Sequence, residues 1–377
     1  DKGHFMAWAR AAIFAALSFL GSALFAQDVT LTSPDGAVEL SGTLLGFDGE
    51  FYRIETVYGE LTVDGSGVLC EGPACPNLQD FVAEVSISGS STMGAVLMPA
   101  LIEGFALRND YIVKREPLEP IGFTHVLIAA DTEKPDARFY IQASTTDEGF
   151  AALLANDADI VMALREIRAD ERSRAREAGM GDMTDANRSR VLALDAMVPI
   201  VAPSNPVDQI SPLALAEVFA GKITNWNVLG GADAPISLHL PGGRTGLGQS
   251  VEDKVMGPVD LPFAEGIIRI DREGDVVDAV LADPFAIGIA SYAETGDGRA
   301  LTLTGACGFS LSAARGTIKT EDYPLTAPMF LYIPARRLPK VARELLAYMR
   351  GASSQIVIRR AGFVDQAPEE VSINDQG

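Results

Sequence analysis

Positive charge is scarce in this chain, and so is histidine. Against 51 Asp and Glu residues stand 30 Lys and Arg, a formal net charge of −21 over 377 residues. Such a surface repels nucleic acid and anionic membranes, so we expect no nucleic-acid partner, and any anion must be bound by a local site. The three histidines, His4, His125 and His239, are widely spaced, and we therefore expect neither a metal centre nor a cofactor.

The sequence patterns of hydrolase sites are missing as well. The chain contains no G-x-S-x-G motif and no convincing histidine partner for a serine nucleophile. His239 is the one histidine near a candidate site, and a partly buried position on a strand is the simpler interpretation of it. An exported hydrolase therefore ranks below a binding protein, and we expect no enzymatic activity.

Long hydrophobic runs are confined to the N-terminus. Lys2 and Arg10 precede an apolar run from Ala11 to Ala26, which is shorter than the roughly 20 residues of a membrane span. The pattern is typical of a secretory signal peptide over residues 1–26, with a retained anchor as the alternative. We expect cleavage after Ala26 and a periplasmic mature protein that begins near Gln27.

Cysteine is also rare, with three residues in the whole chain. Cys70 and Cys75 enclose the tetrapeptide EGPA, in which Gly72 and Pro73 favour a tight turn. In an oxidising compartment this spacing predicts a small-loop disulfide. Half of a metal site is the weaker alternative, because Cys307 is the only other thiol.

Hydrophobic periodicity predicts two kinds of architecture. Residues 27–78 contain short alternating segments (VTLTS, AVELSGTLLGF, FYRIETVYG and ELTVDGSGVL) separated by Gly and Asp turns, which is typical of a small β-meander or barrel. After Pro76, strand-like EVSISGS and HVLIAAD alternate with helical segments such as GFAALLAN. This alternation predicts an α/β domain over 79–365 with a largely parallel sheet, followed by an acidic linker over 366–377.

Two loops carry anion-binding features. ISGSST (87–92) ends a strand where a helix begins, so backbone N–H groups and hydroxyls are available to an anion; a plain helix cap is the alternative. GGRTGLGQS (242–250) reads G-x-x-x-x-G-Q-S, which lacks the lysine of the nucleotide-binding P-loop. We favour an anion cradle over an ATP site at the second loop, with a plain turn as the remaining interpretation.

Five segments in the expected order resemble the PstS-like phosphate-binding proteins of ABC transporters. They are ISGSSTMGAVLMPALIEGF (87–105), ADIVMALREI (158–167), the long stretch at 194–231, AIGIASY (286–292) and YPLTAPMFLYI (323–333). The most specific match is FAGKITNW (219–226) within the long stretch. The β-rich start and the acidic tail resemble a subgroup in which an OmpA-like peptidoglycan-binding domain follows, and this chain would stop before that domain.

The resemblance implies a periplasmic-binding-protein fold, with two α/β lobes and two hinge crossings. Lobe one would take about 80–196 and 294–365, and lobe two about 197–293. In such proteins hydroxyls, helix N-terminal amides and an arginine hold phosphate without a metal. Position by position, the implied ligand-binding residues are Ser91, Thr92, Met93, Thr146, Arg165, Arg244, Leu247, Gly248 and Gln249.

The chain departs from the family pattern at this site. The family's Ser-Gly-Thr is here Leu247-Gly248-Gln249, one residue closer to the arginine, and Leu164 stands where the family has Ser or Asp. Each missing contact is worth about 1–3 kcal/mol in a desolvated site. Either the ligand differs, or Ser91, Ser250 and Gln249 compensate, or the fold is reused without transport. The expected function is capture of phosphate or a related oxyanion for an ABC transporter, with an envelope structural or sensory role as the alternative.

Overall fold

The computed structural model describes residues 28–119, 122–305 and 308–368. The expected signal peptide, Cys307 and residues 369–377 of the expected acidic tail lie outside these ranges. The chain divides into two compact units, with the boundary between Asn77 and Leu78. No helix in the described ranges is both long and apolar enough to span a membrane.

The first unit is a five-stranded antiparallel sheet in the order β4-β3-β2-β1-β5. Its strands are β1 (Val29–Thr32), β2 (Glu39–Phe47), β3 (Phe51–Thr56), β4 (Gly59–Asp64) and β5 (Leu69–Glu71). Val29, Leu31, Tyr52 and Ile54 form its small buried core. Alternation of apolar and polar residues therefore selected the inward faces of these strands, and the predicted all-β module is confirmed.

A disulfide joins Cys70 and Cys75, as the sequence predicts, with Cα atoms 5.8 Å apart. Cys70 lies on β5, and both cysteines pack against the small core of the first unit. Because the closed loop is short, the bond removes little entropy from the unfolded chain and mainly fixes the loop after β5.

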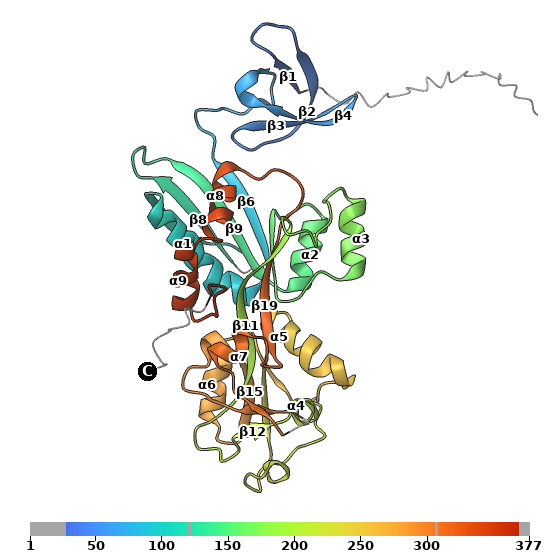
Figure 1. Cartoon of the computed structure of the whole chain (residues 1–377), viewed down its shortest axis with the longest axis vertical. Helices are drawn as coiled ribbons and strands as arrows, with labels where there is room; N and C mark the ends of the chain where they lie inside the picture. Colours follow the sequence, from blue (N-terminus) through green and yellow to red (C-terminus); the bar gives the residue numbers. More distant parts are fainter. Residues whose placement is uncertain (1–27, 120–121, 306–307, 369–377) are drawn as a thin grey trace, which may run out of the picture. The chain divides into compact units, whose positions relative to one another are not determined.

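The second unit is built on one large sheet whose centre is a pair of long strands. β11 (Ser189–Val201) pairs with β19 (Thr326–Tyr332) through its first part and with β15 (Ala286–Ser291) from Met197 onward. From Leu192 onward β11 is buried on both faces, which its sequence LALDAMVPIV, apolar except for Asp195, permits. Figure 1 shows β11 and β19 side by side, linking the helices around α1 and α2 to those around α5 and α6.

The expectation of a largely parallel sheet was wrong, because this sheet is mixed. β6 pairs in parallel with β9 and β10, and β13 with β14 and β15, but the pairs β7–β8, β8–β9, β10–β19, β11–β15 and β11–β19 are antiparallel. β7, β8 and β9 follow one another closely in the sequence, and a short connection allows only antiparallel neighbours. The two strands that cross between the lobes also run in opposite directions.

Lobe one surrounds β6 and its neighbours. Its elements are β6 (Ala83–Ser90), α1 (Met98–Arg108), β7 (Tyr111–Pro117), β8 (Gly122–Ala129), β9 (Pro135–Ser144), α2 (Thr146–Leu154), β10 (Ile160–Ala163), α3 (Ala169–Glu177), the first part of β11, β19, α8 (Lys340–Tyr348) and α9 (Ala352–Arg360). A wider π-helical segment, Met93–Leu97, precedes α1. The predicted α/β class is confirmed here.

Lobe two is built around β13 and β15. Its elements are β12 (Gln209–Ile210), α4 (Pro212–Phe219), β13 (Ser237–Pro241), α5 (Gly246–Val251), β14 (Ile268–Ile270), α6 (Asp275–Ala282), β15, β16 (Arg299–Ala300), β17 (Thr302–Thr304), β18 (Ser310–Leu311) and α7 (Arg315–Lys319). Ser211 caps α4, and Pro212 occupies its first turn, where a missing N–H costs nothing.

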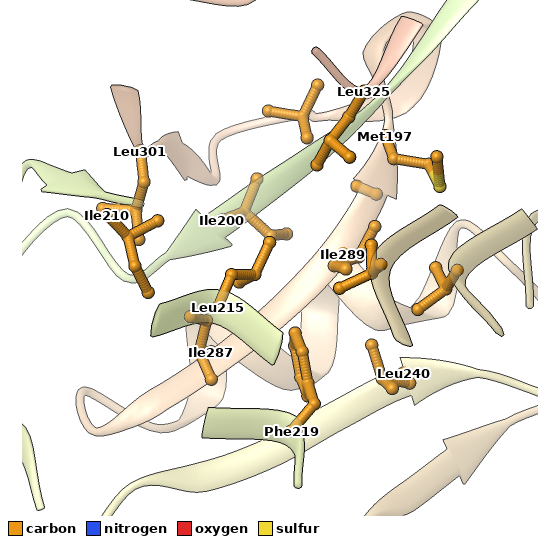
Figure 2. Packing of buried hydrophobic residues seen from close by; sticks show 14 of the residues in the cluster. Met197, Ile200, Ile210, Leu215, Phe219, Leu240, Ile287, Ile289, Leu301 and Leu325 are labelled. Carbon is orange, nitrogen blue, oxygen red and sulfur yellow. The ribbon is translucent and has the colours of Figure 1, made fainter. Parts of the chain in front are cut away.

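The hydrophobic core of lobe two extends past the boundary expected at residue 293. Leu301, Ile318 and Leu325 belong to the same buried cluster as Met197 and Phe219. Figure 2 shows Leu301 and Leu325 among the side chains of this cluster. Leu301, Ile318 and Leu325 therefore pack with lobe two, although the boundary expected from the sequence places them in lobe one. The chain returns to lobe one only along β19.

Candidate functional site

Three strands of the second unit each lead into a helix that bears predicted site residues. After β6 the chain becomes helical at Ser91, after β9 it enters α2 at Thr146, and after β13 it enters α5 at Gly246. The first backbone N–H groups of a helix have no partner within that helix, so each start must find acceptors elsewhere. Two of these starts belong to lobe one and the third to lobe two.

The donors at the first and third helix starts bind one carboxylate. Ser91 Oγ donates to Oε1 of Glu273 at 3.0 Å, and Thr92 Oγ1 donates to Oε2 at 2.7 Å. The backbone N–H of Leu247 donates to Oε1 at 2.9 Å. We call these three donors, from Ser91, Thr92 and Leu247, the cradle. Because Ser91 and Thr92 lie in lobe one and Leu247 in lobe two, the cradle spans both lobes.

A direct backbone contact brings the two lobes together beside the cradle. The N–H of Gly246 donates to Ser91 Oγ at 2.9 Å. A Cβ atom at Gly246 would lie 2.3 Å from Ser90 Oγ, so only glycine allows this approach. Ser90 Oγ is buried and has no hydrogen-bond partner among the described residues. The GGRTGLGQS loop therefore faces the ISGSST loop, as the anion-cradle interpretation requires.

Two hydrogen bonds link the second helix start to other elements. Thr146 Oγ1 accepts from the N–H of Leu164 at 3.0 Å, which joins α2 to the end of β10. Gln249 of lobe two accepts from the N–H of Asp147 through Oε1 at 3.3 Å. The Thr146 hydroxyl thus has a structural contact within lobe one, whereas the Gln249 side chain bridges the lobes.

Arg165 is held by carboxylates of its own lobe. Its guanidinium donates to both oxygens of Glu171, at 2.9 and 2.8 Å, and also pairs with Asp147. Burial by itself lowers the pKa of Arg165, but the hydrogen bonds to Glu171 and Asp147 outweigh burial and raise it above its usual value. The structure therefore does not bring Arg165 into the cradle, because its donors already serve a bidentate ion pair.

Arg244, in contrast to Arg165, is not held by carboxylates in the described part of the chain. It lies exposed in the turn before α5, and no described residue forms a hydrogen bond or an ion pair with its guanidinium. Thr245 next to it is buried and caps α5 by accepting from the N–H of Gly248 at 3.0 Å. Two residues before the Gly246 contact, Arg244 is thus a charge without a partner among the residues that the structure describes.

The remaining predicted site residues place no side chain in the cradle. Met93 is fully buried in the core of lobe one, and the side chain of Leu247 is buried in the core of lobe two. The N–H of Gly248 serves the cap from Thr245, and Ser250 Oγ donates to the carbonyl of Gly246 at 3.1 Å. Of the sequence Leu247-Gly248-Gln249, only the first amide therefore reaches the carboxylate.

Further acidic groups surround Glu273. Asp195 on β11 is 1% exposed, and burial raises its pKa to about 7, helped by the charge of Glu273 and opposed by hydrogen bonds from Ser291 and the backbone. Burial also raises the pKa of Glu294, and Glu273 adds to the rise while Arg272 opposes it. Asp195 and Glu294 therefore lie near enough to Glu273 for its charge to raise the pKa of each.

Sequence reasoning missed Glu273. It lies in the turn just before α6, 182 residues from Ser91 and 26 from Leu247. An acidic residue before a helix is ordinarily explained by the helix dipole. Within the described ranges no cluster of His, Cys, Asp and Glu has the arrangement of a metal site. His239 is buried on β13, and burial lowers its pKa.

The sequence is similar to a protein superfamily and to proteins of known name. A family model described as the PBP superfamily domain matches residues 119–351. The phosphate-binding protein PstS of Bacillus subtilis is 25% identical over 259 residues, which cover 67% of this chain and 80% of that protein. PstS of Borreliella burgdorferi is 21% identical over 197 residues, 50% of this chain and 70% of the relative.

Solved structures resemble the second unit in fold. A Clostridium perfringens protein assigned as a phosphate ABC transporter substrate-binding protein, solved with bound phosphate, has a TM-score of 0.56 at 20% identity. An ABC-type phosphate transport receptor from Vibrio cholerae has a TM-score of 0.56 at 19% identity. Each match covers 75% of this chain and all of the other. At these identities the likeness concerns the fold, and it confirms the two-lobed periplasmic-binding-protein architecture.

Proposed function

The chain belongs to the PBP superfamily, and on that premise we propose that it captures phosphate or a related oxyanion between its two lobes for an ABC transporter. The family consists of substrate-binding proteins, so the chain is a binding protein and not an enzyme. The names of the relatives, phosphate-binding protein PstS among them, support phosphate as the first ligand to test.

The observation that carries the proposal is the binding of one carboxylate by donors of both lobes. Ser91, Thr92 and the N–H of Leu247 all donate to the two oxygens of Glu273. A carboxylate is itself an oxyanion, so these groups have the spacing and polarity that an oxyanion needs. In phosphate the same donors would meet oxygens of a tetrahedral group.

Arg244 would supply the positive charge for a bound oxyanion. Its guanidinium is exposed and without a partner in the described part of the chain, so it is free to turn toward a ligand. The backbone at Met93, the Thr146 hydroxyl and the amide of Gln249 would complete the surroundings of the ligand. We leave Arg165 out of the set, because Glu171 and Asp147 engage both of its terminal guanidinium nitrogens.

Export is part of the proposal. The apolar segment before Gln27 and the Cys70–Cys75 disulfide both support a periplasmic protein, since disulfides persist in oxidising compartments. The ABC transporter's membrane subunits would be the partners of the loaded protein. N-terminal sequencing of the protein from a periplasmic fraction tests this part, and a first residue upstream of the apolar run would contradict it.

Calorimetric titration of the mature protein tests the ligand class. Phosphate, sulfate and methylphosphonate are titrated separately, with chloride as the control for ionic strength. Saturable binding of one oxyanion with a stoichiometry of about one per chain is expected. Absence of binding for all of them, in protein with a cooperative unfolding transition, would contradict the proposal.

One observation favours a second candidate, an envelope structural or sensory protein on the same fold. Every cradle donor is engaged by Glu273, and the leucines at 164 and 247 are buried in the cores of the lobes. The separate β module would then be the interacting part of this chain. Failure of all oxyanions, with sedimentation of the protein on isolated peptidoglycan, would favour this candidate.

A further inference from the structure

Glu273 belongs to lobe two, yet it binds donors of lobe one. It lies in the turn before α6, which packs on β15 and β13 of lobe two. Its carboxylate accepts from Ser91 and Thr92 of lobe one, and it also accepts from the N–H of Leu247 in its own lobe. The contacts with Ser91 and Thr92, at 3.0 and 2.7 Å, join the two lobes through the Glu273 carboxylate, and the contact with Leu247, at 2.9 Å, fixes that carboxylate to its own lobe.

The cradle cannot serve Glu273 and an external oxyanion together. A serine or threonine hydroxyl carries one proton, and a backbone amide carries one. Each of these protons is directed to a Glu273 oxygen, and the Ser91 oxygen already accepts from Gly246. An incoming oxyanion obtains these hydrogen bonds only after the carboxylate leaves.

Charge reinforces this exclusion. Ionised Glu273 and an oxyanion at the same donors would be like charges in a partly desolvated place, where their repulsion is stronger than in water. The neighbourhood already shows the effect, because burial and then Glu273 raise the pKa of Glu294. Co-occupancy is thus disfavoured by electrostatics as well as by donor count.

We propose that Glu273 is a tethered competitor, which fills the cradle and holds the two lobes closed until an external oxyanion displaces it. The inference rests on the proposed function, since displacement requires a ligand. Glu273 then determines ligand affinity. The two lobes close around the Glu273 carboxylate, and the ligand binds only those molecules in which this carboxylate has left the cradle. The sequence departures at Leu164 and Leu247 then accompany a site adapted to an internal anion.

The test compares phosphate binding of wild type, Glu273→Ala and Glu273→Gln by calorimetry of the full mature protein. Alanine removes the carboxylate from the cradle, and we expect phosphate affinity to rise about tenfold or more. A tenfold rise corresponds to a wild-type protein in which the Glu273 carboxylate has left the cradle in about a tenth of the molecules. Glutamine keeps one acceptor oxygen without the charge, so an intermediate gain is expected. Asp278→Ala is the matched control: it removes one exposed charge from α6 and is expected to leave affinity unchanged.

Hydrogen exchange gives a readout that needs no ligand. The amides of Gly246 and Leu247 donate to Ser91 and Glu273, so a peptide covering both should exchange slowly in ligand-free wild type. Glu273→Ala should exchange faster there, and saturating phosphate should restore the protection. Asp278→Ala should exchange as wild type does.

The outcomes separate the two proposals. Phosphate binding by wild type with no gain in Glu273→Ala overturns the tethered competitor and leaves the proposed function standing. Binding of no oxyanion by any of the proteins overturns both. Unchanged exchange of the Gly246 and Leu247 amides in Glu273→Ala overturns the closing role of Glu273, whatever the affinities are.

Discussion

The hydroxyl of Ser291 on β15 donates to the buried carboxyl of Asp195 on β11 at 2.7 Å. The other oxygen of Asp195, Oδ1, has no hydrogen-bond partner among the described residues. The pair lies at the part of β11 where the chain passes from lobe one to lobe two. A carboxyl that is 1% exposed and incompletely paired is expected to hold its proton, which agrees with the pKa of about 7 that burial produces.

Asp195→Asn is therefore predicted to flatten the pH dependence of stability. In the unfolded chain Asp ionises at a pKa of about 3.9. Between that value and about 7 the folded protein binds the proton that the unfolded chain has released, so the free energy of unfolding of wild type falls as pH rises through this window. The loss attributable to Asp195 is at most about 4 kcal/mol, and Asn has no proton to lose.

Urea unfolding from pH 4 to pH 8 measures this effect. The difference in unfolding free energy between Asp195→Asn and wild type should grow with pH up to about 7 and then stay constant. The exposed Asp297, changed to Asn, serves as the control and should run parallel to wild type. Parallel curves for Asp195→Asn as well would mean that Asp195 is ionised in the folded protein.

Arg244→Ala is predicted to weaken oxyanion binding without loss of stability. An exposed side chain that contacts no charged partner in the described chain contributes within about 0.5 kcal/mol to folding. A hydrogen bond from its guanidinium to a ligand is worth about 1.5–3 kcal/mol, so affinity should fall roughly tenfold to a hundredfold.

Calorimetry and thermal unfolding of the same samples check the two halves of this prediction. Arg108→Ala, which removes an exposed arginine from the end of α1, is the control for net charge. Equal oxyanion affinity in Arg244→Ala and wild type would remove Arg244 from the site.

Gly246→Ala is predicted to impair closure of the lobes. The added methyl group would lie 2.3 Å from Ser90 Oγ and 3.1 Å from Ser90 Cβ, so the helix start must retreat from lobe one. Forcing such a contact costs about 1–3 kcal/mol. Oxyanion affinity and the hydrogen-exchange protection of the 242–250 loop should both decrease. Gly243→Ala is the matched control in the same loop, because its methyl group would meet nothing within 4 Å.

A second substitution, added to Gly246→Ala, distinguishes a steric clash with Ser90 from a general loss of helix stability. Ser90→Ala removes the Oγ atom that the Gly246 methyl group would meet, so the double variant should regain part of the affinity. A double variant no better than Gly246→Ala would show that the contact with Ser90 is not the cause.

Thiol titration checks the disulfide. The chain has three cysteines, and a bond between Cys70 and Cys75 leaves three minus two, or one, free thiol. Denatured protein from the periplasm should therefore react with one equivalent of Ellman's reagent, and with three after reduction. Three reactive thiols before reduction would contradict the bond.

Local sequence determined the parts of this protein that depend on neighbouring residues. Alternation of apolar residues between Gly and Asp turns was sufficient for the β module, and the short spacing of Cys70 and Cys75 was sufficient for their bond. The helix that follows the strand end ISGSST (87–92) was also predicted from the residues at that strand end, and it begins at Ser91. In each case the deciding interactions lie within a few residues of one another.

Tertiary structure alone decided which groups meet at the site. Arg165 and Glu171 are close in sequence, but whether an arginine binds a neighbouring carboxylate or a ligand depends on where the lobes place both. Glu273 is 182 residues from Ser91 and 181 from Thr92, so no local sequence pattern indicates its contact with them. The mixed sheet and the packing of Leu301 and Leu325 with lobe two likewise result from pairing between distant segments. Hydrogen bonds and ion pairs form only between groups a few ångströms apart, and the fold decides which residues far apart in the sequence come that close.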